Sequence, residues 1–226
     1  MSGNDKIVPS LLSPEKAERA YGSANKSPAG NSGQAPSSPT FPLIYEINTR
    51  SWLKDWENQA PRATPFLLQD VPERQFKEWQ AQGFTHIWLM GVWKIGPKAR
   101  KQAESQWKGE ARQTRREICG SPFSIAAWEV CESIGGRAGL ALFRERLHAY
   151  GLALIVDFVP NHLGIDHPWI QERPGLFVRS AVRQEGTFRP AREKNGEAPA
   201  WFAQGKDPFF PPWNDTVQLD YRNVPS

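Results

Sequence analysis

The chain has 226 residues, of which 39% are hydrophobic and 23% charged, so it is long enough to bury the core of a globular, soluble domain. Its longest apolar stretches, such as residues 152–158, are too short to span a bilayer, and its N-terminus lacks the apolar segment of a secretory signal peptide. We therefore expect a cytoplasmic protein with no membrane partner, in which Cys119 and Cys131 are reduced thiols rather than a disulfide.

The formal net charge is +4, and much of the positive charge lies in residues 94–116. Glu104 and Glu110 interrupt this basic stretch, and no RNA-binding motif accompanies it. The pattern favours a solvated loop or helix face, so no nucleic-acid partner is expected. A basic nucleic-acid-binding protein is the alternative that this stretch leaves open.

The N-terminal residues 1–40 are rich in Ser, Pro, Gly, Asn and Ala and have almost nothing to bury, which predicts a disordered arm. The folded region is predicted to begin at Phe41. A strand is expected over residues 43–48, where aromatic and β-branched residues follow Pro42 without a further breaker.

Two later segments repeat one order of elements, a helix, a glycine and an apolar strand. In residues 71–82, Val71, Phe76 and Trp79 lie on one helical face, Gly83 fits the C-terminal end, and a buried strand is predicted over 84–90. The second copy has a helix over 137–150, then Gly151 and a strand over 152–158. Its apolar helical positions are Leu140, Phe143, Leu147 and Tyr150.

Strands that are apolar on both faces and follow a helix are typical of a parallel sheet covered by helices, which predicts the α/β class. The connections between the three strands are long, about 35 and 61 residues, as happens where loops carry function. Residues 163–226 show no convincing long helix or strand and are rich in Pro, Gly and aromatic residues. They are expected to form an irregular loop or small subdomain.

Polar residues gather at the end of the third predicted strand, where Asp157 is followed by Asn161 and His162. A carboxylate on a buried apolar strand must be hydrogen-bonded or paired. In barrels, polar residues at the carboxyl ends of strands usually build the active site. The alternative is that Asp157 caps the next turn and that the following residues are an ordinary loop.

Ten tryptophans add flat faces on which sugar rings can stack, although core packing explains many such residues.

Five segments resemble the α-amylase family of glycoside hydrolases and occur in the family's order. They are YEINTRSW, GFTHIWLMGVW, GSPFSIAAWEV, VDFVPNH and VQLDYRN, which are similar to the family's first strand, second strand, aromatic-bearing loop, third strand and the short motif before the fourth strand. The resemblance covers roughly residues 41–226 and implies a partial (β/α)8 TIM barrel. Residues 41–162 would hold its first three βα units, and residues 163–226 would be the long loop or subdomain after strand 3, truncated before strand 4.

The resemblance also implies roles for individual residues. His162 would contact the sugar in the subsite where the glycosyl unit is attacked, and Asp157 would be a buried carboxylate that helps to hold an Arg of the catalytic cluster. Phe123 stands where the family usually has a Tyr that stacks under the reactive sugar. Asn161 matches a position that ligates a structural calcium in many members, but it supplies one oxygen where calcium takes about six to eight.

Retaining glycoside hydrolysis needs a nucleophile and an acid/base, two carboxylates about 5–5.5 Å apart. By resemblance these follow the fourth and fifth strands, so neither is expected within this chain and no catalytic residue is assigned. The expected function is that of a fragment of an α-amylase-like retaining hydrolase acting on α-glucans or maltooligosaccharides, inactive alone. The alternatives are an α-glucan transglycosylase parent and a non-catalytic carbohydrate-binding or regulatory module.

Overall fold

The computed structural model describes residues 41–59, 63–106, 120–190 and 200–223. The predicted arm over residues 1–40, Cys119 and the second half of the basic stretch lie outside these residues. No helix in the described ranges is long and apolar enough to cross a membrane.

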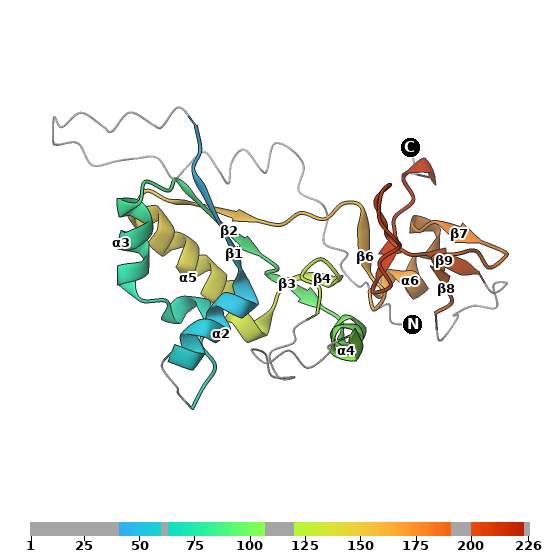
Figure 1. The fold of residues 1–226 in the computed structure, drawn as a ribbon, viewed down its shortest axis with the longest axis horizontal. Helices are drawn as coiled ribbons and strands as arrows, with labels where there is room; N and C mark the ends of the chain where they lie inside the picture. Colours follow the sequence, from blue (N-terminus) through green and yellow to red (C-terminus); the bar gives the residue numbers. More distant parts are fainter. Residues whose placement is uncertain (1–40, 60–62, 107–119, 191–199, 224–226) are drawn as a thin grey trace, which may run out of the picture. The chain divides into compact units, whose positions relative to one another are not determined.

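A three-stranded parallel sheet forms the first part of the structure (Figure 1). Its strands are β1 (Ile44–Asn48), β2 (His86–Met90) and β5 (Ala153–Val156), in the order β1-β2-β5. The register pairs Ile47 with Leu89 and Leu89 with Val156. The three predicted strands are therefore present and parallel, each one to three residues shorter than expected. Among the described residues the sheet does not close into a barrel.

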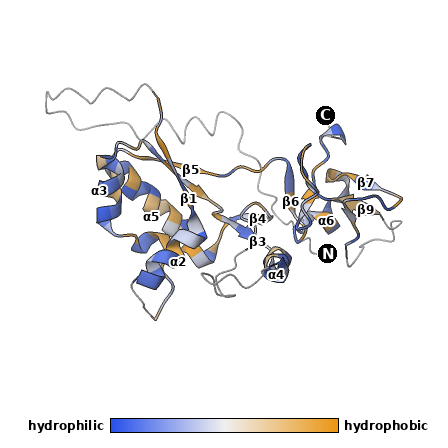
Figure 2. Cartoon of the chain, viewed as in Figure 1, coloured by the Kyte–Doolittle hydropathy of each residue, from blue (hydrophilic) through white to orange (hydrophobic). Residues whose placement is uncertain are grey.

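Helices α3 (Glu73–Ala81) and α5 (Gly136–Ala149) bury the apolar faces that the sequence predicts. Phe76 and Phe143 are fully buried and their ring centroids lie 5.3 Å apart. Both helices are followed by a glycine with positive φ, Gly83 at 82° and Gly151 at 70°, a conformation that glycine adopts without strain. Figure 2 shows the contrast between the hydrophobic residues of β5 and the mostly hydrophilic residues of α3.

Helix α2 (Thr49–Gln59) begins directly after β1, where no element was predicted from the sequence. The side-chain oxygen of Asn48 accepts a hydrogen bond from the backbone N–H of Ser51, at 3.4 Å, in the manner of a helix N-cap. Trp52 and Leu53 then pack into the same core as the predicted helices. The predicted strand over residues 43–48 therefore ends at Asn48 as expected, and α2 follows it without having been predicted.

Residues 120–130, expected as an aromatic-bearing loop, contain strand β4 (Ile125–Val130). It pairs antiparallel with β3 (Trp93–Ile95) through an irregular register. The buried, β-branched Ile125 and the contact of Trp93 with Trp128, with ring centroids 5.4 Å apart, favour this pairing over a loop. The basic stretch begins at Lys94 in β3 and continues into helix α4 (Pro97–Gln106), whose residues are largely solvent-exposed.

The remaining strands are short and lie between residues 162 and 218. Strand β6 (His162–Gly164) pairs antiparallel with β10 (Thr216–Gln218), and β9 (Trp201–Ala203) lies between β7 (Arg179–Ser180) and β8 (Thr187–Phe188). A second hydrophobic cluster, which includes Leu163, Phe177 and Phe202, is buried among them. The other short helices are η1 (Leu68–Asp70), η3 (Glu132–Ile134), α6 (Trp169–Glu172), η4 (Pro174–Leu176) and η5 (Tyr221–Asn223).

Candidate functional site

Asp157 lies directly after β5 and is 7% exposed. Its carboxylate accepts hydrogen bonds from the indole N–H of Trp88, at 2.8 Å, and from the backbone N–H of Gly91, at 2.5 Å. Its backbone oxygen accepts a third from the indole of Trp93, at 2.8 Å. The buried carboxylate is thus satisfied by neutral donors and ties the end of β5 to the end of β2. Its role in holding a catalytic arginine stays a prediction.

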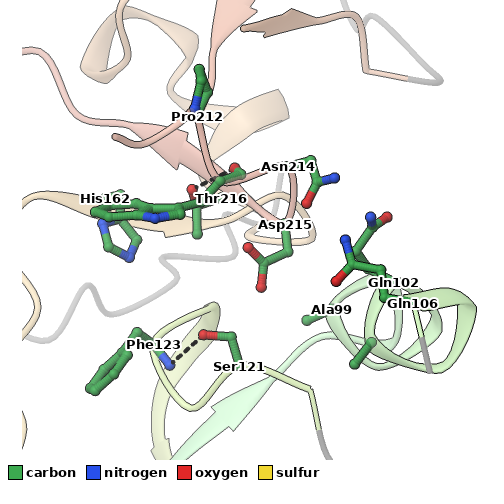
Figure 3. A pocket seen from close by; sticks show the side chains of 12 residues that line it. Ala99, Gln102, Gln106, Ser121, Phe123, His162, Pro212, Asn214, Asp215 and Thr216 are labelled. Atoms are coloured by element: carbon green, nitrogen blue, oxygen red, sulfur yellow. Dashed lines mark hydrogen bonds between the residues drawn. The ribbon is translucent and has the colours of Figure 1, made fainter. Parts of the chain in front are cut away.

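A cavity of about 480 Å³ lies beside this region (Figure 3). His162 of β6 and Phe123 of the turn before β4 both line it, so the structure brings these two predicted site residues together. Helix α4 contributes Gln102 and Gln106, the loop before β10 contributes residues 212–215, and β10 contributes Thr216. The cavity size is in the range of small-molecule sites. Neither Asp157 nor Asn161 lines it.

His162 is 7% exposed, and its ring centroid lies 5.1 Å from that of Trp213. Its Nδ1 is 3.2 Å from the amide nitrogen of Asn161. Burial lowers the pKa of the imidazole, and a hydrogen bond with the backbone of Phe123 acts in the opposite direction. The ring is therefore neutral at pH 7, with one nitrogen that donates and one that accepts a hydrogen bond. Such a group can bind a sugar hydroxyl.

Asp215 is the one acidic residue among the described residues that line the cavity, and Figure 3 shows its carboxylate pointing inward. Burial raises the pKa of this carboxyl. Its backbone oxygen accepts hydrogen bonds from the Ser124 hydroxyl, at 2.7 Å, and from the Ile165 N–H, at 3.1 Å, which fixes the loop. Sequence reasoning did not select Asp215 or Trp213, because a Trp-Asn-Asp turn has no distinctive signal.

The side chain of Asn161, for which the resemblance implies a calcium position, is hydrogen-bonded within the chain. Asn161 is exposed, and its side-chain oxygen accepts a hydrogen bond from the amide of Gln218, at 2.9 Å. Within the described ranges no group of three or more His, Cys, Asp or Glu side chains could hold a metal ion. The side-chain oxygen of Asn161 is thus engaged by an amide donor, and calcium ligation at this position stays a prediction.

No protein-family model matches the chain. Part of the chain is nevertheless similar to curated proteins that are named as enzymes of 1,4-alpha-glucan. It is 28% identical over 123 residues to the alpha-1,4-glucan:maltose-1-phosphate maltosyltransferase of Pseudomonas aeruginosa, a match that covers 52% of the chain and 17% of the relative. It is 29% identical over 133 residues to a 1,4-alpha-glucan branching enzyme of Xanthomonas campestris, covering 54% of the chain and 14% of the relative.

Among solved structures, the chain is similar to an alpha-amylase from Lactobacillus plantarum, with a TM-score of 0.51 and 20% identity. That match covers 80% of the chain and 32% of the alpha-amylase. The fold of the described residues thus resembles part of the fold of this alpha-amylase. The predicted relationship to the α-amylase family of glycoside hydrolases is confirmed. The chain spans less than a fifth of the length of the two curated relatives.

Proposed function

We propose that the chain forms the first part of the catalytic barrel of an α-amylase-like enzyme acting on α-glucans or maltooligosaccharides. Strands β1, β2 and β5 would be the first three strands of a (β/α)8 barrel, and residues 163–226 the long excursion after the third. The observation that carries the proposal is the position of His162, which follows β5 in the chain and lines the cavity with Phe123 and Trp213.

The cavity offers the two kinds of contact that a glucose unit needs. The rings of Phe123 and Trp213 present apolar faces to the sugar C–H groups. The neutral imidazole of His162 and the carboxyl of Asp215 can exchange hydrogen bonds with sugar hydroxyls. These groups come from the turn before β4, from β6 and from the loop before β10, so one sugar would contact three separate segments.

Retaining hydrolysis needs two carboxylates about 5–5.5 Å apart, and Asp215 is the single carboxylate among the described residues of the cavity wall. We infer that the nucleophile and the acid/base are not supplied by this chain, so the isolated chain binds sugar without turnover. The missing pair leaves hydrolysis and glycosyl transfer as alternatives for the whole enzyme. Transfer has support in the maltosyltransferase name of one relative.

A second candidate is a non-catalytic carbohydrate-binding or regulatory module. The same observation favours it, since the one carboxylate among the described residues of the cavity wall can bind a sugar but cannot by itself supply the two-carboxylate mechanism. The two candidates predict the same behaviour for the isolated chain. The two candidates predict different results when the isolated chain is mixed with a protein that carries the later barrel strands. If the chain is part of an enzyme, the mixture should release or transfer glucose units; if it is a binding module, it should not.

Titration of maltotriose into the 226-residue chain, followed by tryptophan fluorescence, tests the proposed site because Trp213 lies against His162. We expect saturable binding that the substitution His162→Ala weakens by about fivefold or more, since a lost hydrogen bond and contact cost roughly 1 kcal/mol or more. The control is His148→Ala, which removes an exposed histidine from the last turn of α5. Equal affinity in all three proteins, or release of reducing sugar by the isolated chain, would contradict the proposal.

A further inference from the structure

Two neighbouring phenylalanines stand out from the loop between β9 and β10. Phe209 is 89% exposed and Phe210 is 67% exposed. Phenylalanine side chains bury a large apolar area when they find a partner, so an adjacent exposed pair is a candidate contact surface. Single exposed apolar residues are common, but this pair belongs to a loop that also builds the cavity wall.

The loop holds the pair in a defined conformation. One oxygen of the Asp207 carboxylate accepts hydrogen bonds from the backbone N–H groups of Phe209, at 2.7 Å, and Phe210, at 3.0 Å. Gly205 and Trp213 form an isolated β-bridge that closes the base of the loop, with a hydrogen bond of 2.8 Å. The exposure of the two rings is therefore built into a fixed turn, which lowers the entropy cost of binding a ligand there.

The same loop is continuous with the proposed sugar site. Pro212 and Trp213 line the cavity, and Trp213 contacts His162. Phe210 lies three residues before Trp213, so their Cα atoms are at most roughly 11 Å apart along an extended chain. A cavity of about 480 Å³ holds a small ligand, so a longer glucan bound in it must continue outside.

We propose that Phe209 and Phe210 form a second contact surface for the glucan chain where it leaves the cavity. The inference rests on the proposed function, and it names the ligand as a linear α-glucan longer than the cavity can hold. The flat C–H faces of successive glucose units stack on the two rings, while the hydroxyl groups at their edges stay in water. The surface therefore increases affinity for long chains and leaves the affinity for short ones unchanged.

Calorimetric titration of maltotriose and maltoheptaose into the wild type and the Phe209→Ala/Phe210→Ala double variant tests this surface. The wild type is expected to bind maltoheptaose more tightly than maltotriose. The double variant is expected to lose about tenfold in affinity for maltoheptaose and to keep its affinity for maltotriose, since aromatic contacts of this kind change affinity by roughly threefold to tenfold.

Two further variants make the test specific. Phe41→Ala removes a phenylalanine that is 78% exposed at the start of the folded region, and it should leave both affinities unchanged. Phe209→Tyr/Phe210→Tyr keeps the flat rings and should keep the tight binding of maltoheptaose. Circular dichroism spectra that match the wild type confirm that the double variant is folded.

The outcomes separate this inference from the proposed function. If the wild type binds neither sugar, both fail. If it binds maltotriose but the double variant keeps full affinity for maltoheptaose, the Phe209–Phe210 surface fails and the proposed function stands. An equal loss of affinity for both sugars also overturns the inference. So does a sedimentation experiment in which the wild type is a dimer and the double variant a monomer, if the two proteins bind maltoheptaose with the same affinity.

Discussion

His162 holds a neutral imidazole in the cavity wall, in contact with Trp213. Burial lowers the pKa of this histidine below 6.5, and burial also lowers the pKa of His167, which stacks edge-on against Trp169. Between the lowered values and 6.5, the unfolded chain binds protons that the folded chain does not. Stability therefore falls as the pH falls below about 6.5.

We expect the urea midpoint of unfolding to be lower at pH 5.5 than at pH 7.5, and the difference to shrink in His162→Gln. The comparison stays above the acidic range in which the lowered pKa values of Glu73 and Asp220 contribute. The raised pKa of Asp215 acts in the opposite direction, because its carboxyl binds a proton more readily in the folded chain. A midpoint that rises at pH 5.5, or a difference that His162→Gln leaves unchanged, would contradict the buried neutral histidine.

At the scale of single residues, the need for a partner at Asp157 was predictable, because a carboxylate beside a buried strand cannot remain unsatisfied. The partners themselves were not predictable. Trp88 and Gly91 are more than sixty residues earlier in the chain, and their N–H groups reach Asp157 only because β2 pairs with β5. The cavity position of Asp215 likewise depends on the pairing of β10 with β6.

Helix α4 shows how one side chain fixes the start of a whole element. The carboxylate of Asp166, in the loop after β6, accepts a hydrogen bond from the backbone N–H of Lys98, at 2.7 Å, and its other oxygen lies 3.7 Å from the Lys98 ammonium. Gly96 makes the approach possible, because a Cβ at that position would lie 2.1 Å from an Asp166 oxygen. Asp166 thus caps α4 from a distant part of the chain.

We predict that Asp166→Ala lowers the free energy of unfolding by about 1 kcal/mol, the usual cost of losing a helix cap. Maltotriose affinity should fall with it, because Gln102 and Gln106 of α4 line the cavity. Asp166→Asn keeps the accepting oxygen and serves as the control in urea unfolding. If Asn destabilises as much as Ala, or if Ala is neutral, the carboxylate does not cap the helix.

Among the elements, periodicity predicted those with long apolar patterns. The strands β1, β2 and β5 and the helices α3 and α5 lie within three residues of their expected bounds. Helix α2 was missed because its first residues continue a β-like sequence, although Asn48 followed by Trp52, Leu53 and Trp56 carried a helical signal. The strands from β6 to β10 have only two or three residues each and pair over long separations, so no local pattern could reveal them.

At the scale of the described chain as a whole, two separate hydrophobic clusters support the structure. One joins the parallel sheet to α2, α3 and α5, and the other holds the short strands after residue 162. The cavity takes its walls from α4, the turn before β4, β6 and the loop before β10. The lining residues lie more than 100 residues apart in sequence, from Gln102 to Thr216, so the proposed sugar site would form only in the folded chain.

Hydrogen–deuterium exchange of the 226-residue chain with and without maltoheptaose shows whether the cavity around His162 binds an α-glucan. We expect slower exchange of backbone amides in residues 121–125, 162–164 and 212–216, with α3 unchanged as the internal reference. Unchanged exchange in all three segments at saturating sugar, or protection confined to residues far from the cavity, would contradict glucan binding in this cavity.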